Sequence, residues 1–443
     1  MRLFLLLPLV TGLMAAGCSS PTPAADGSGS HPPTMSSSPS PSPSPSPSVD
    51  PNAPTGWGPT EGELARARSL VAAMPVEQRA WQVLMPSFWG FRADKAGSAE
   101  AGRNRDSHRV DTIAEALGTH EYGGVFIKPQ SIEDAKQVAI LADGLHAAGD
   151  RPDDLPLLVS VDQEGGVVQR VKKGVTRLPP PKQIGRTGDA ALARRIARDN
   201  AQEMRALGFT MLLAPVADVD RVGNKIVASR SFSTTYAGAA QMVTATMQGF
   251  LDAGIIPVVK HFPGHGSVEG DSHHSLPVQK KTVDQLLKSD LIPFKAAIDA
   301  GVPAVMTAHI AVNAVEPGMP ASLSSGVIEG ILRGRLGFKG VVVTDSQGMG
   351  PIYGHYGTAE GAVRSLLAGN DLVLNSPDVT VAHDAVVKAV KSGRIREQRL
   401  DDAATRVVAL RIYQQRIGAT QPPMSVLRAP SHLADVAKAG QRG

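Results

Sequence analysis

Short apolar runs recur along the chain after about residue 80, and polar or glycine-containing stretches follow them. Such runs, bounded by turn residues, are typical of strands that are buried on both faces of a parallel sheet. Eight of them can be counted, at residues 81–86, 124–127, 155–161, 210–214, 255–259, 304–306, 340–343 and 371–374. Segments rich in Ala, Leu, Arg, Glu and Gln favour helices between most of the runs, at residues 131–148, 190–207, 239–252, 285–299 and 358–367.

This alternation of strands and helices indicates an α/β fold with a parallel sheet. Because eight strands are expected, we predict a single (β/α)8 TIM-type barrel, with an open doubly wound sheet as the alternative. Neither a Gly-x-Gly-x-x-Gly turn nor a Walker loop occurs, which disfavours the nucleotide-binding form of the open sheet. A last helical stretch at residues 381–414, interrupted near Gly393, should cover the outside.

The N-terminus has the pattern of an export signal. A Met-Arg pair is followed by an apolar run at residues 3–10 and by small residues. The sequence Ala-Ala-Gly-Cys, which ends at Cys18, resembles a bacterial lipoprotein signal. We therefore predict a signal peptide at residues 1–17 and lipidation of Cys18, the one cysteine of the chain. An ordinary secretory signal with an incidental cysteine is the alternative, and both interpretations predict export.

Pro, Ser, Gly and Thr dominate the residues that follow Cys18. This composition cannot bury an apolar core, so residues 18–58 should form the lipidated cysteine and a disordered Ser/Pro-rich tether. A globular domain is predicted at residues 59–420 and a C-terminal tail at 421–443. The domain should then be exported and held by its lipid at the outer face of the cell membrane, in the cell envelope.

The amino-acid composition limits the classes of molecule that the protein can be expected to bind. Hydrophobic residues make up 42% and charged residues 19% of the 443 residues, as in soluble globular proteins, and the formal net charge is +4. Lys and Arg are scattered and form no basic stripe interleaved with aromatic residues, so no nucleic-acid partner is expected. Aromatic residues make up only 4%, so a bound ligand must be held mainly by hydrogen bonds.

Charged residues follow five of the eight apolar runs. In a (β/α)8 barrel, active sites are built at the carboxyl ends of the strands. Asp162 and Arg170 follow the third run, Arg230 lies beyond the fourth, and Lys260 and His261 follow the fifth. Such a ring of charged groups suits a polar ligand such as a sugar. A salt-bridge network that ties loops together is the alternative.

Residues 260–277 contain four of the 12 histidines, and their glycines and prolines indicate a polar loop at the end of a strand. Asp271 lies two residues before His273, and a nearby carboxylate orients an imidazole and raises its basicity. The pair therefore suits general acid/base catalysis. A metal site is the competing interpretation, but the sequence has no His-x-x-x-His on a helix and no His-x-His strand pair.

Asp345 follows the apolar run at residues 340–343 and should be presented at a fixed point on the rim. A carboxylate in such a place can attack an anomeric carbon or stabilise an oxocarbenium charge. A helix N-cap is the alternative, because a helix must follow.

These motifs resemble, in the same order, the signatures of family 3 glycoside hydrolases, and more narrowly those of the bacterial β-N-acetylglucosaminidase branch. The similarity runs from about residue 65 to about residue 415 and therefore covers the globular part. Its segments are residues 162–170, 214–219, 230–232, 260–273, 306–309 and 344–346.

The resemblance implies a retaining exo-β-N-acetylglucosaminidase that acts on terminal N-acetylglucosamine of peptidoglycan or muropeptide fragments. It implies that Asp345 is the nucleophile and that His273 is the general acid/base, assisted by Asp271. The residues that it implies for holding the terminal sugar are Asp162, Arg170, Arg230, Lys260 and His261. It implies no metal and no cofactor, and we expect a monomer. A β-glucosidase-like member of the same family and a non-catalytic sugar-binding lipoprotein remain as alternatives.

Three residues depart from the usual pattern of the family, namely Val167, Gln347 and Gly348. They lie beside predicted site residues, so they leave the preference for the aglycone open. The glycines between His261 and His273 predict a mobile loop, and we expect residues 264–274 to close over bound sugar.

Overall fold

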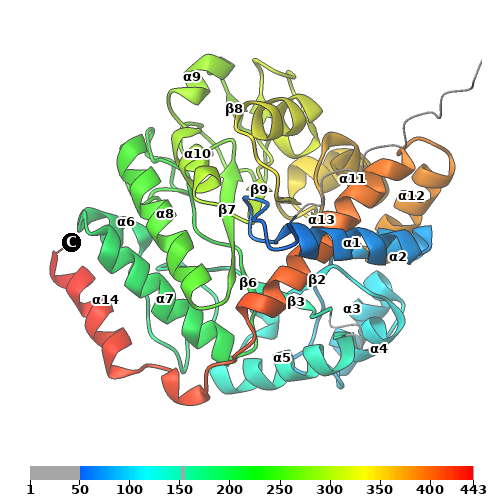
Figure 1. The fold of residues 1–443 in the computed structure, drawn as a ribbon, viewed down its shortest axis with the longest axis horizontal. Coiled ribbons are helices and arrows are strands. Elements are labelled where there is room, and N and C mark those ends of the chain that lie inside the picture. Colours follow the sequence, from blue (N-terminus) through cyan, green and yellow to red (C-terminus); the bar gives the residue numbers. More distant parts are fainter. Residues whose placement is uncertain (1–49, 151–154, 443) are drawn as a thin grey trace, which may run out of the picture. The chain divides into compact units, whose positions relative to one another are not determined.

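The computed structural model describes residues 50–150 and 155–442. The predicted signal peptide, Cys18 and the tether up to residue 49 lie outside the described residues. Six parallel strands form the main sheet in the order β11-β9-β7-β6-β3-β2 (Figure 1). The parallel strands are β1 Leu84–Met85, β2 Gly124–Phe126, β3 Leu158–Val161, β6 Met211–Leu212, β7 Ile256–Phe262, β9 Ala304–Thr307, β11 Val341–Thr344 and β12 Val373–Leu374.

Strands β1 and β12 pair with each other and contact both edges of the six-stranded sheet. At one edge the amide of Phe126 donates to the carbonyl of Pro86 over 2.8 Å, and at the other a parallel bridge joins Val343 to Leu372. The sheet is therefore curled. Each of the eight predicted apolar runs contains or overlaps one of these strands. The predicted α/β class is confirmed, and closure of the sheet into a complete barrel stays a prediction.

Helices follow most of the strands and pack on the outside of the sheet (Figure 1). The α-helices are α1 Glu61–Ala73, α2 Val76–Gln82, α3 Ser98–His108, α4 Ile113–Thr119, α5 Ala135–Gly149, α6 Pro181–Arg186, α7 Ala190–Ala206, α8 Tyr236–Asp252, α9 Val283–Leu287, α10 Ile292–Asp299, α11 Gly350–Ala368, α12 Val379–Lys391, α13 Glu397–Ile417 and α14 Pro430–Arg442. The shorter elements are the strands β4 Gln163–Gly165, β5 Val168–Gln169, β8 Val278–Gln279 and β10 Ala311–Val312, the 3-10 turns η1 Pro129–Ser131, η2 Ala321–Leu323 and η4 Met424–Val426, and the π-helical segment η3 Gly326–Arg335.

Two predicted helical stretches are each divided into two helices. The stretch at residues 285–299 is wrong as a single helix, because α9 ends at Leu287 and α10 begins at Ile292. Pro293 stands in the first turn of α10, where its missing amide hydrogen costs nothing, whereas inside a helix it would break a hydrogen bond. The last stretch is interrupted between α12 and α13 by Gly393, whose φ of 74° favours glycine.

Helices α7 and α8 pack closely outside the strands that carry much of the site. The carboxylate of Asp189 caps α7 by accepting from the amide of Leu192 over 2.9 Å. Gly249 of α8 lies so near α7 that a Cβ atom there would be 2.3 Å from the carbonyl oxygen of Arg194. Only glycine permits this approach, so the sequence fixes the two helices at short range.

The segment predicted as a C-terminal tail, residues 421–443, contains helix α14. This helix lies against α6 and α7 (Figure 1). The buried His432 approaches Glu203 of α7 with 2.8 Å between Nδ1 and Oε1, and the same carboxylate oxygen accepts from the amide of Arg428 over 2.9 Å. A buried carboxylate with several donors is costly to disrupt, so the end of the chain is bound to the domain.

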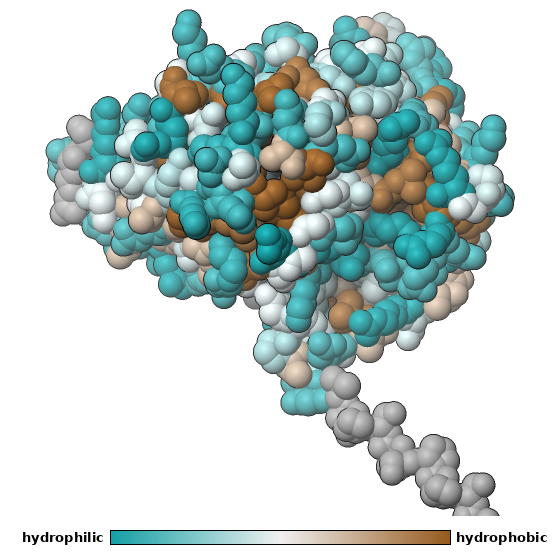
Figure 2. Space-filling view, turned by 90° about the horizontal axis from the view of Figure 1, so that it is seen from above, coloured by the Kyte–Doolittle hydropathy of each residue, from teal (hydrophilic) through white to brown (hydrophobic). Residues whose placement is uncertain are grey.

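The surface view in Figure 2 shows a face on which hydrophilic residues predominate and apolar residues form separate groups. Within residues 50–150 and 155–442, no helix combines the length and the apolar character that a membrane crossing requires.

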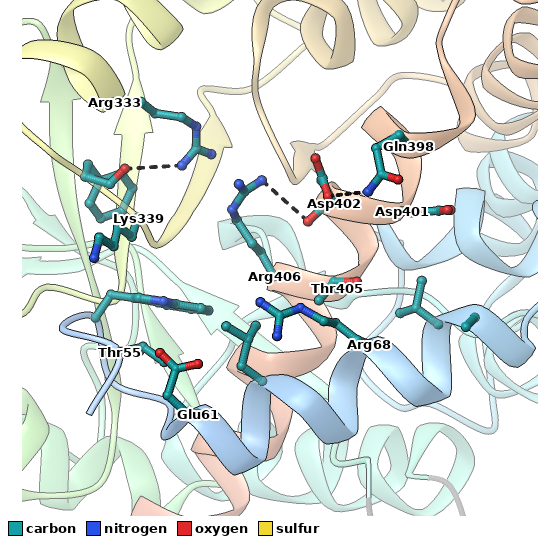
Figure 3. A pocket seen from close by; sticks show the side chains of 15 residues that line it. Thr55, Glu61, Arg68, Arg333, Lys339, Gln398, Asp401, Asp402, Thr405 and Arg406 are labelled. Atoms are coloured by element: carbon teal, nitrogen blue, oxygen red, sulfur yellow. Dashed lines mark hydrogen bonds between the residues drawn. The ribbon is translucent and has the colours of Figure 1, made fainter. Parts of the chain in front are cut away.

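A cavity of about 540 Å³ lies at the amino-terminal end of the strands, against α1 and α13. Figure 3 shows Arg68, Arg333, Arg406 and Lys339 around it, with Lys339 on the same side as Arg333. Arg333 donates to the carbonyl of Gly340, which directly precedes β11, over 3.3 Å. Both signs of charge line this cavity, because Glu61, Asp401 and Asp402 share its walls.

Asp371 joins the arginines beside this cavity to the start of strands β11 and β12. Its carboxylate is 0% exposed and accepts from Arg333 over 2.6 Å, from Arg406 over 3.1 Å and from Arg399 over 3.2 Å. It also accepts from the amide of Val342 over 3.0 Å. Although burial opposes the effect, Arg333, Arg406 and Arg399 hold the pKa of Asp371 below its usual value.

We expect Asp371→Asn to lower the free energy of unfolding by about 3 kcal/mol, because it leaves buried arginines without their counter-charge. A group whose pKa is depressed by folding stabilises the fold above its unfolded pKa, so the loss should be full above about pH 4 and shrink below it. Urea unfolding at several pH values measures this. Asp299→Asn, which removes an exposed pair with Lys295, is the control and should cost much less. An equal cost for both variants would contradict the assignment.

Candidate active site

A cavity of about 490 Å³ opens at the carboxyl end of the parallel strands. Seven of the eight predicted catalytic and sugar-binding residues line it, namely Asp162, Arg170, Arg230, Lys260, His261, His273 and Asp345. The eighth, Asp271, lies outside the lining and bonds to His273. The structure therefore brings the predicted site together in one place, and the predicted lipidation site Cys18 lies outside the described residues.

Lys260 and His261 belong to strand β7, which extends to Phe262. The prediction that the polar loop begins at Lys260 is wrong, because the strand continues beyond its apolar residues. Lys260 has only 3% of its side chain exposed, and its Nζ lies 2.6 Å from Asp162 Oδ1 and 2.8 Å from Glu164 Oε1. A buried ammonium needs such partners, and although burial opposes it, Asp162 and Glu164 raise the pKa of Lys260.

Glu164 is a central residue of the site that was not among the predicted site residues. Its side chain is 1% exposed and accepts two hydrogen bonds of 2.7 Å from Arg230, one from Nε and one from Nη2. Although burial opposes it, the charges of Arg230 and Lys260 hold the pKa of Glu164 below its usual value. A signal was present, because Glu164 stands in the hairpin β4–β5 that directly follows strand β3.

Asp218 orients His261 from below the cavity. The distance from His261 Nδ1 to Asp218 Oδ2 is 2.6 Å, and the other oxygen accepts from the amide of His265 over 2.6 Å. This carboxylate is 0% exposed, and although burial opposes it, His261 lowers its pKa. A donor hydrogen on Nδ1 makes Nε2 of His261 an acceptor, and Arg230 Nη2 lies 3.4 Å from it, so Asp218 and Arg230 together set the orientation of the ring.

Asp345 follows strand β11 directly and faces the cavity. The N-cap interpretation is wrong, because α11 begins at Gly350 and Met349 occupies its N-cap. The amide of Ser346 donates to Asp345 Oδ1 over 2.7 Å. Although burial opposes it, His309 and then His261 lower the pKa of Asp345. Asp345 is therefore an ionised carboxylate at neutral pH, as a nucleophile must be.

His309 supports the chain beside Asp345. Its ring is buried, with Nε2 2.9 Å from the carbonyl of Ser346 and Nδ1 2.7 Å from the hydroxyl of Ser322. Burial lowers the pKa of His309. The ring of His309 thus holds the turn that follows β11. The sequence contained a signal for this position, because the apolar run at residues 304–306 shows that His309 lies at the end of a strand.

Asp271 and His273 form a close pair at the mouth of the cavity. His273 Nδ1 lies 2.6 Å from Asp271 Oδ1, which also accepts from the amide of His273 over 2.9 Å. The carbonyl of His273 accepts from the amide of Gly350 over 3.1 Å, which ties the loop to the start of α11. His273 has 57% of its side chain exposed and lines the cavity, so it can exchange protons with both water and a ligand.

Two glycines of this loop are required by close packing. A Cβ atom on Gly266 would lie 2.2 Å from the carbonyl oxygen of Val219, and one on Gly264, at a φ of 110°, would lie 2.9 Å from Asp290 Cβ. Close packing therefore also explains why glycine occurs at these two positions. The closure of residues 264–274 over a bound sugar stays a prediction.

The remaining histidines bear on the metal interpretation. In the described parts of the chain, no group of three or more His, Cys, Asp or Glu residues is arranged to hold a metal ion. His265 lines the cavity and is 3% exposed, and neither of its ring nitrogens has a partner among the described residues. A buried imidazole without partners is unfavourable, which makes His265 a further candidate for contact with a ligand.

The three departures from the family pattern differ in position. Val167 is 64% exposed and lines the cavity. Gln347 is buried, and no described residue bonds its side-chain amide. Gly348 is exposed beside it. Only Val167 is therefore placed to touch a ligand directly.

Comparisons with known proteins agree with this geometry. The model of the glycosyl hydrolase family 3 N-terminal domain matches residues 76–410. A β-hexosaminidase of Xanthomonas campestris is 39% identical over 285 residues, which cover 63% of this chain and 82% of that protein. The structure of a family 3 β-N-acetylglucosaminidase from Paenibacillus aligns with a TM-score of 0.74 at 36% identity, over 84% of this chain and 69% of the other.

The structure of NagZ from Neisseria gonorrhoeae in complex with N-trifluoroacetyl-D-glucosamine aligns with a TM-score of 0.62 at 29% identity, over 81% of this chain and 97% of that one. These similarities confirm the predicted enzyme class, a glycoside hydrolase of the β-N-acetylhexosaminidase type. The chain belongs to glycosyl hydrolase family 3.

Proposed function

We propose that the protein is a retaining exo-β-N-acetylglucosaminidase that removes terminal N-acetylglucosamine from peptidoglycan or muropeptide fragments. One observation carries the proposal. A single cavity contains an ionised aspartate, a partly exposed imidazole paired with a carboxylate, and a network of charged hydrogen-bonding groups. These are the groups that retaining glycoside cleavage needs on opposite sides of one sugar.

In the first step, an oxygen of Asp345 attacks the anomeric carbon while the protonated His273 gives its proton to the departing aglycone oxygen. The glycosidic bond breaks and a glycosyl ester forms on Asp345. In the second step, neutral His273 takes a proton from water, and this water cleaves the ester with net retention. Asp271 accepts the Nδ1 hydrogen of His273 throughout, so Nε2 is the nitrogen that exchanges the proton.

The terminal sugar is held by groups whose positions are already fixed. Lys260 and Arg230 are bound by carboxylates, and Asp218 orients His261, so little ordering remains when ligand binds. Arg170 lines the cavity and no described residue forms an ion pair with it, so its guanidinium can bind sugar oxygens. His265 supplies a further imidazole with two open nitrogens.

Three finer parts of the proposal concern architecture and location. The contacts of β1 and β12 with both sheet edges support a complete (β/α)8 barrel. The sequence before residue 50 supports export and attachment to the outer face of the cell membrane through lipid on Cys18. We further propose that the enzyme acts as a monomer, which size-exclusion chromatography with light scattering tests.

Asp345→Ala should lower kcat for a chromogenic aryl N-acetyl-β-glucosaminide by roughly 10²-fold or more, because no covalent intermediate can form. Mass spectrometry of the wild-type enzyme, quenched during turnover of a slow substrate, should show one N-acetylglucosaminyl group on the peptide that contains Asp345. Asp299→Asn is the control for handling and should keep full activity. Substantial turnover by Asp345→Ala would refute the assignment of the nucleophile.

His273→Ala should slow substrates with poor leaving groups by about 10²- to 10⁴-fold, because these need a proton on the departing oxygen. A dinitrophenyl glycoside, whose leaving group needs no proton, should lose much less in the first step. His274→Ala is a matched control, because His274 is 85% exposed and does not line the cavity. Equal losses for both leaving groups would argue against acid catalysis by His273.

The same assay separates the alternatives. A β-glucosidase-like enzyme would cleave the aryl glucoside at least as fast as the N-acetyl compound. A non-catalytic sugar-binding protein would bind N-acetylglucosamine in calorimetry and cleave neither.

A further inference from the structure

Helix α14 is connected to the catalytic cavity by a chain of buried hydrogen bonds, although none of its residues lines that cavity. The helix packs against α6 and α7. It begins at Pro430, after residue 410, where the match to the family model ends. The contacts of α14 are therefore features of this chain that the family match does not explain.

Glu203 of α7 is the centre of this chain of bonds. Its buried carboxylate accepts from the amide of Arg428 over 2.9 Å and from His432 Nδ1 over 2.8 Å. It also accepts from Thr176, over 2.8 Å from the amide and over 2.6 Å from the hydroxyl. An ionised carboxylate only accepts, so the hydrogen of the histidine lies on Nδ1. One side chain thus joins the C-terminal segment to the loop between β5 and α6.

Thr176 continues the chain of bonds to the hairpin β4–β5. Its carbonyl accepts from Gln169 Nε2 over 2.9 Å, and the same nitrogen donates to the carbonyl of Val171 over 3.1 Å. Gln163 Nε2 donates to that carbonyl of Val171 over 3.1 Å, and Gln163 Oε1 accepts from the amide of Arg170 over 2.9 Å. Both glutamines are buried, so these bonds are shielded from water. The backbone of Arg170 is therefore fixed by the loop that α7 holds.

The hairpin needs this support, because its strands have only three and two residues and such a short hairpin is marginally stable at best by itself. Glu164 of β4 has a second support, since Arg230 and Lys260 bind its carboxylate. Arg170 lines the cavity without such support, because its buried Nε has no partner among the described residues. The direction of its guanidinium therefore depends on its backbone, and so on the loop.

His432 holds Glu203 in two ways. It supplies one of the hydrogen bonds to the carboxylate, and its ring also contacts Asp199, with 3.8 Å between Nε2 and Oδ1. Asp199 lies one turn before Glu203 on α7, and like charges at this spacing repel each other. Loss of the imidazole would therefore remove a donor and leave two buried carboxylates side by side, which favours a different position of Glu203.

We propose that His432 and Glu203 are positioning residues for Arg170, so that helix α14 sets the affinity of the catalytic cavity for the terminal sugar. This rests on the proposed function, in which Arg170 binds oxygens of that sugar. His432 does not line the cavity and acts through Glu203 and the loop before α6. Asp345 and His273 come from other segments of the chain, so the reacting groups keep their places when this chain of bonds is cut.

The first test measures the inhibition constant of N-acetylglucosamine together with kcat and KM for a chromogenic aryl N-acetyl-β-glucosaminide. His432→Ala should raise the inhibition constant and KM about fivefold, because the ligand must then order one long side chain. The value of kcat should change less than about twofold, since contacts made equally with substrate and transition state affect KM alone. His432→Asn keeps an amide nitrogen near the place of Nδ1 and should hold the inhibition constant within about twofold of wild type.

A double-mutant cycle then decides whether His432 acts through Arg170. Arg170→Met alone should raise the inhibition constant about tenfold or more, because a charged hydrogen-bond donor is lost. Addition of His432→Ala to Arg170→Met should change the inhibition constant less than about twofold, because there is no longer a guanidinium to direct. A merely structural role of His432 would give losses that add.

Two variants control for lost stability. His383→Ala removes another buried imidazole, whose Nε2 lies 3.1 Å from the carbonyl of Glu77, and should lower the midpoint of thermal unfolding without changing the inhibition constant. Asp435→Asn removes an ion pair between α14 and Arg195 of α7 and should also leave the inhibition constant unchanged.

The proposal would be overturned by an unchanged inhibition constant in His432→Ala, by equal losses in His432→Ala and His432→Asn, or by additive losses in the cycle. If His432→Ala does not fold, Thr176→Val decides, because it removes the 2.6 Å hydrogen bond to Glu203. It should raise the inhibition constant at least about twofold, and no change would overturn the proposal. Failure of the proposed function is distinct, since wild-type enzyme would then neither cleave the aryl compound nor bind N-acetylglucosamine in calorimetry.

Discussion

The buried carboxylate of Glu164 is the interaction on which the rest of the site depends. It binds Lys260 of β7 and Arg230 of the segment after β6, and it stands itself in the hairpin after β3. Because β3, β6 and β7 are neighbours in the sheet, one carboxylate joins three consecutive strand ends. Without it, the nearly buried Arg230 would lose its ion-pair partner and Lys260 would keep only Asp162, at a cost of about 3 kcal/mol. The groups proposed to bind the sugar are therefore placed by these ion pairs before any ligand binds.

A contrast between paired and unpaired charges follows from this arrangement. Charged residues with ion-pair partners join strand ends to one another. Lys260 does so at the carboxyl ends of the strands, and Asp371 does so at their amino ends. His265, whose two ring nitrogens have no partner among the described residues, faces the catalytic cavity. Unpaired buried polar atoms also occur away from the cavity, at Tyr122 and Thr244 for example, so a missing partner points to a ligand only where the side chain lines the cavity. Paired charges thus hold the fold together, whereas unpaired groups in the cavity are the candidates for ligand binding.

The positions of the strands along the chain were predicted well, because parallel strands that are buried on both faces leave continuous apolar runs. The sequence also predicted the cluster of charged strand ends, because the carboxyl ends of parallel strands share one edge. Prediction from the sequence failed where contacts between distant residues determine the position of a side chain. Lys260 is charged, yet it lies within the buried strand β7, because the carboxylates of Asp162 and Glu164 neutralise its charge there. Those partners lie almost a hundred residues away, and no local pattern reveals them.

Other failures have the same cause. Glu164 was visible in the hairpin after β3, but its importance comes from Arg230, 66 residues later. Residues 421–443 were predicted as a C-terminal tail, but they contain helix α14, whose His432 binds the buried Glu203. The glycines at 264 and 266 predicted a mobile loop, which stays a prediction, and close packing is a second reason for glycine at both positions. Local composition cannot distinguish a glycine that permits motion from one that permits close contact.

The unequal exposure of Asp345 and His273 agrees with the division of labour proposed for them. A nucleophile must remain ionised and fixed, and Asp345 is held by the amide of Ser346 near the strand end. An acid/base group must exchange protons with water, and His273 is 57% exposed. Exposure removes the packing that would orient its ring, so Asp271 and the hydrogen bond to Gly350 must supply the orientation. A second carboxylate in place of His273 would repel Asp345 once both were ionised, whereas a neutral imidazole does not. The carboxylate of Asp271 thus lies at the mouth of the cavity, outside its lining, whereas His273, the proposed base, lines the cavity itself.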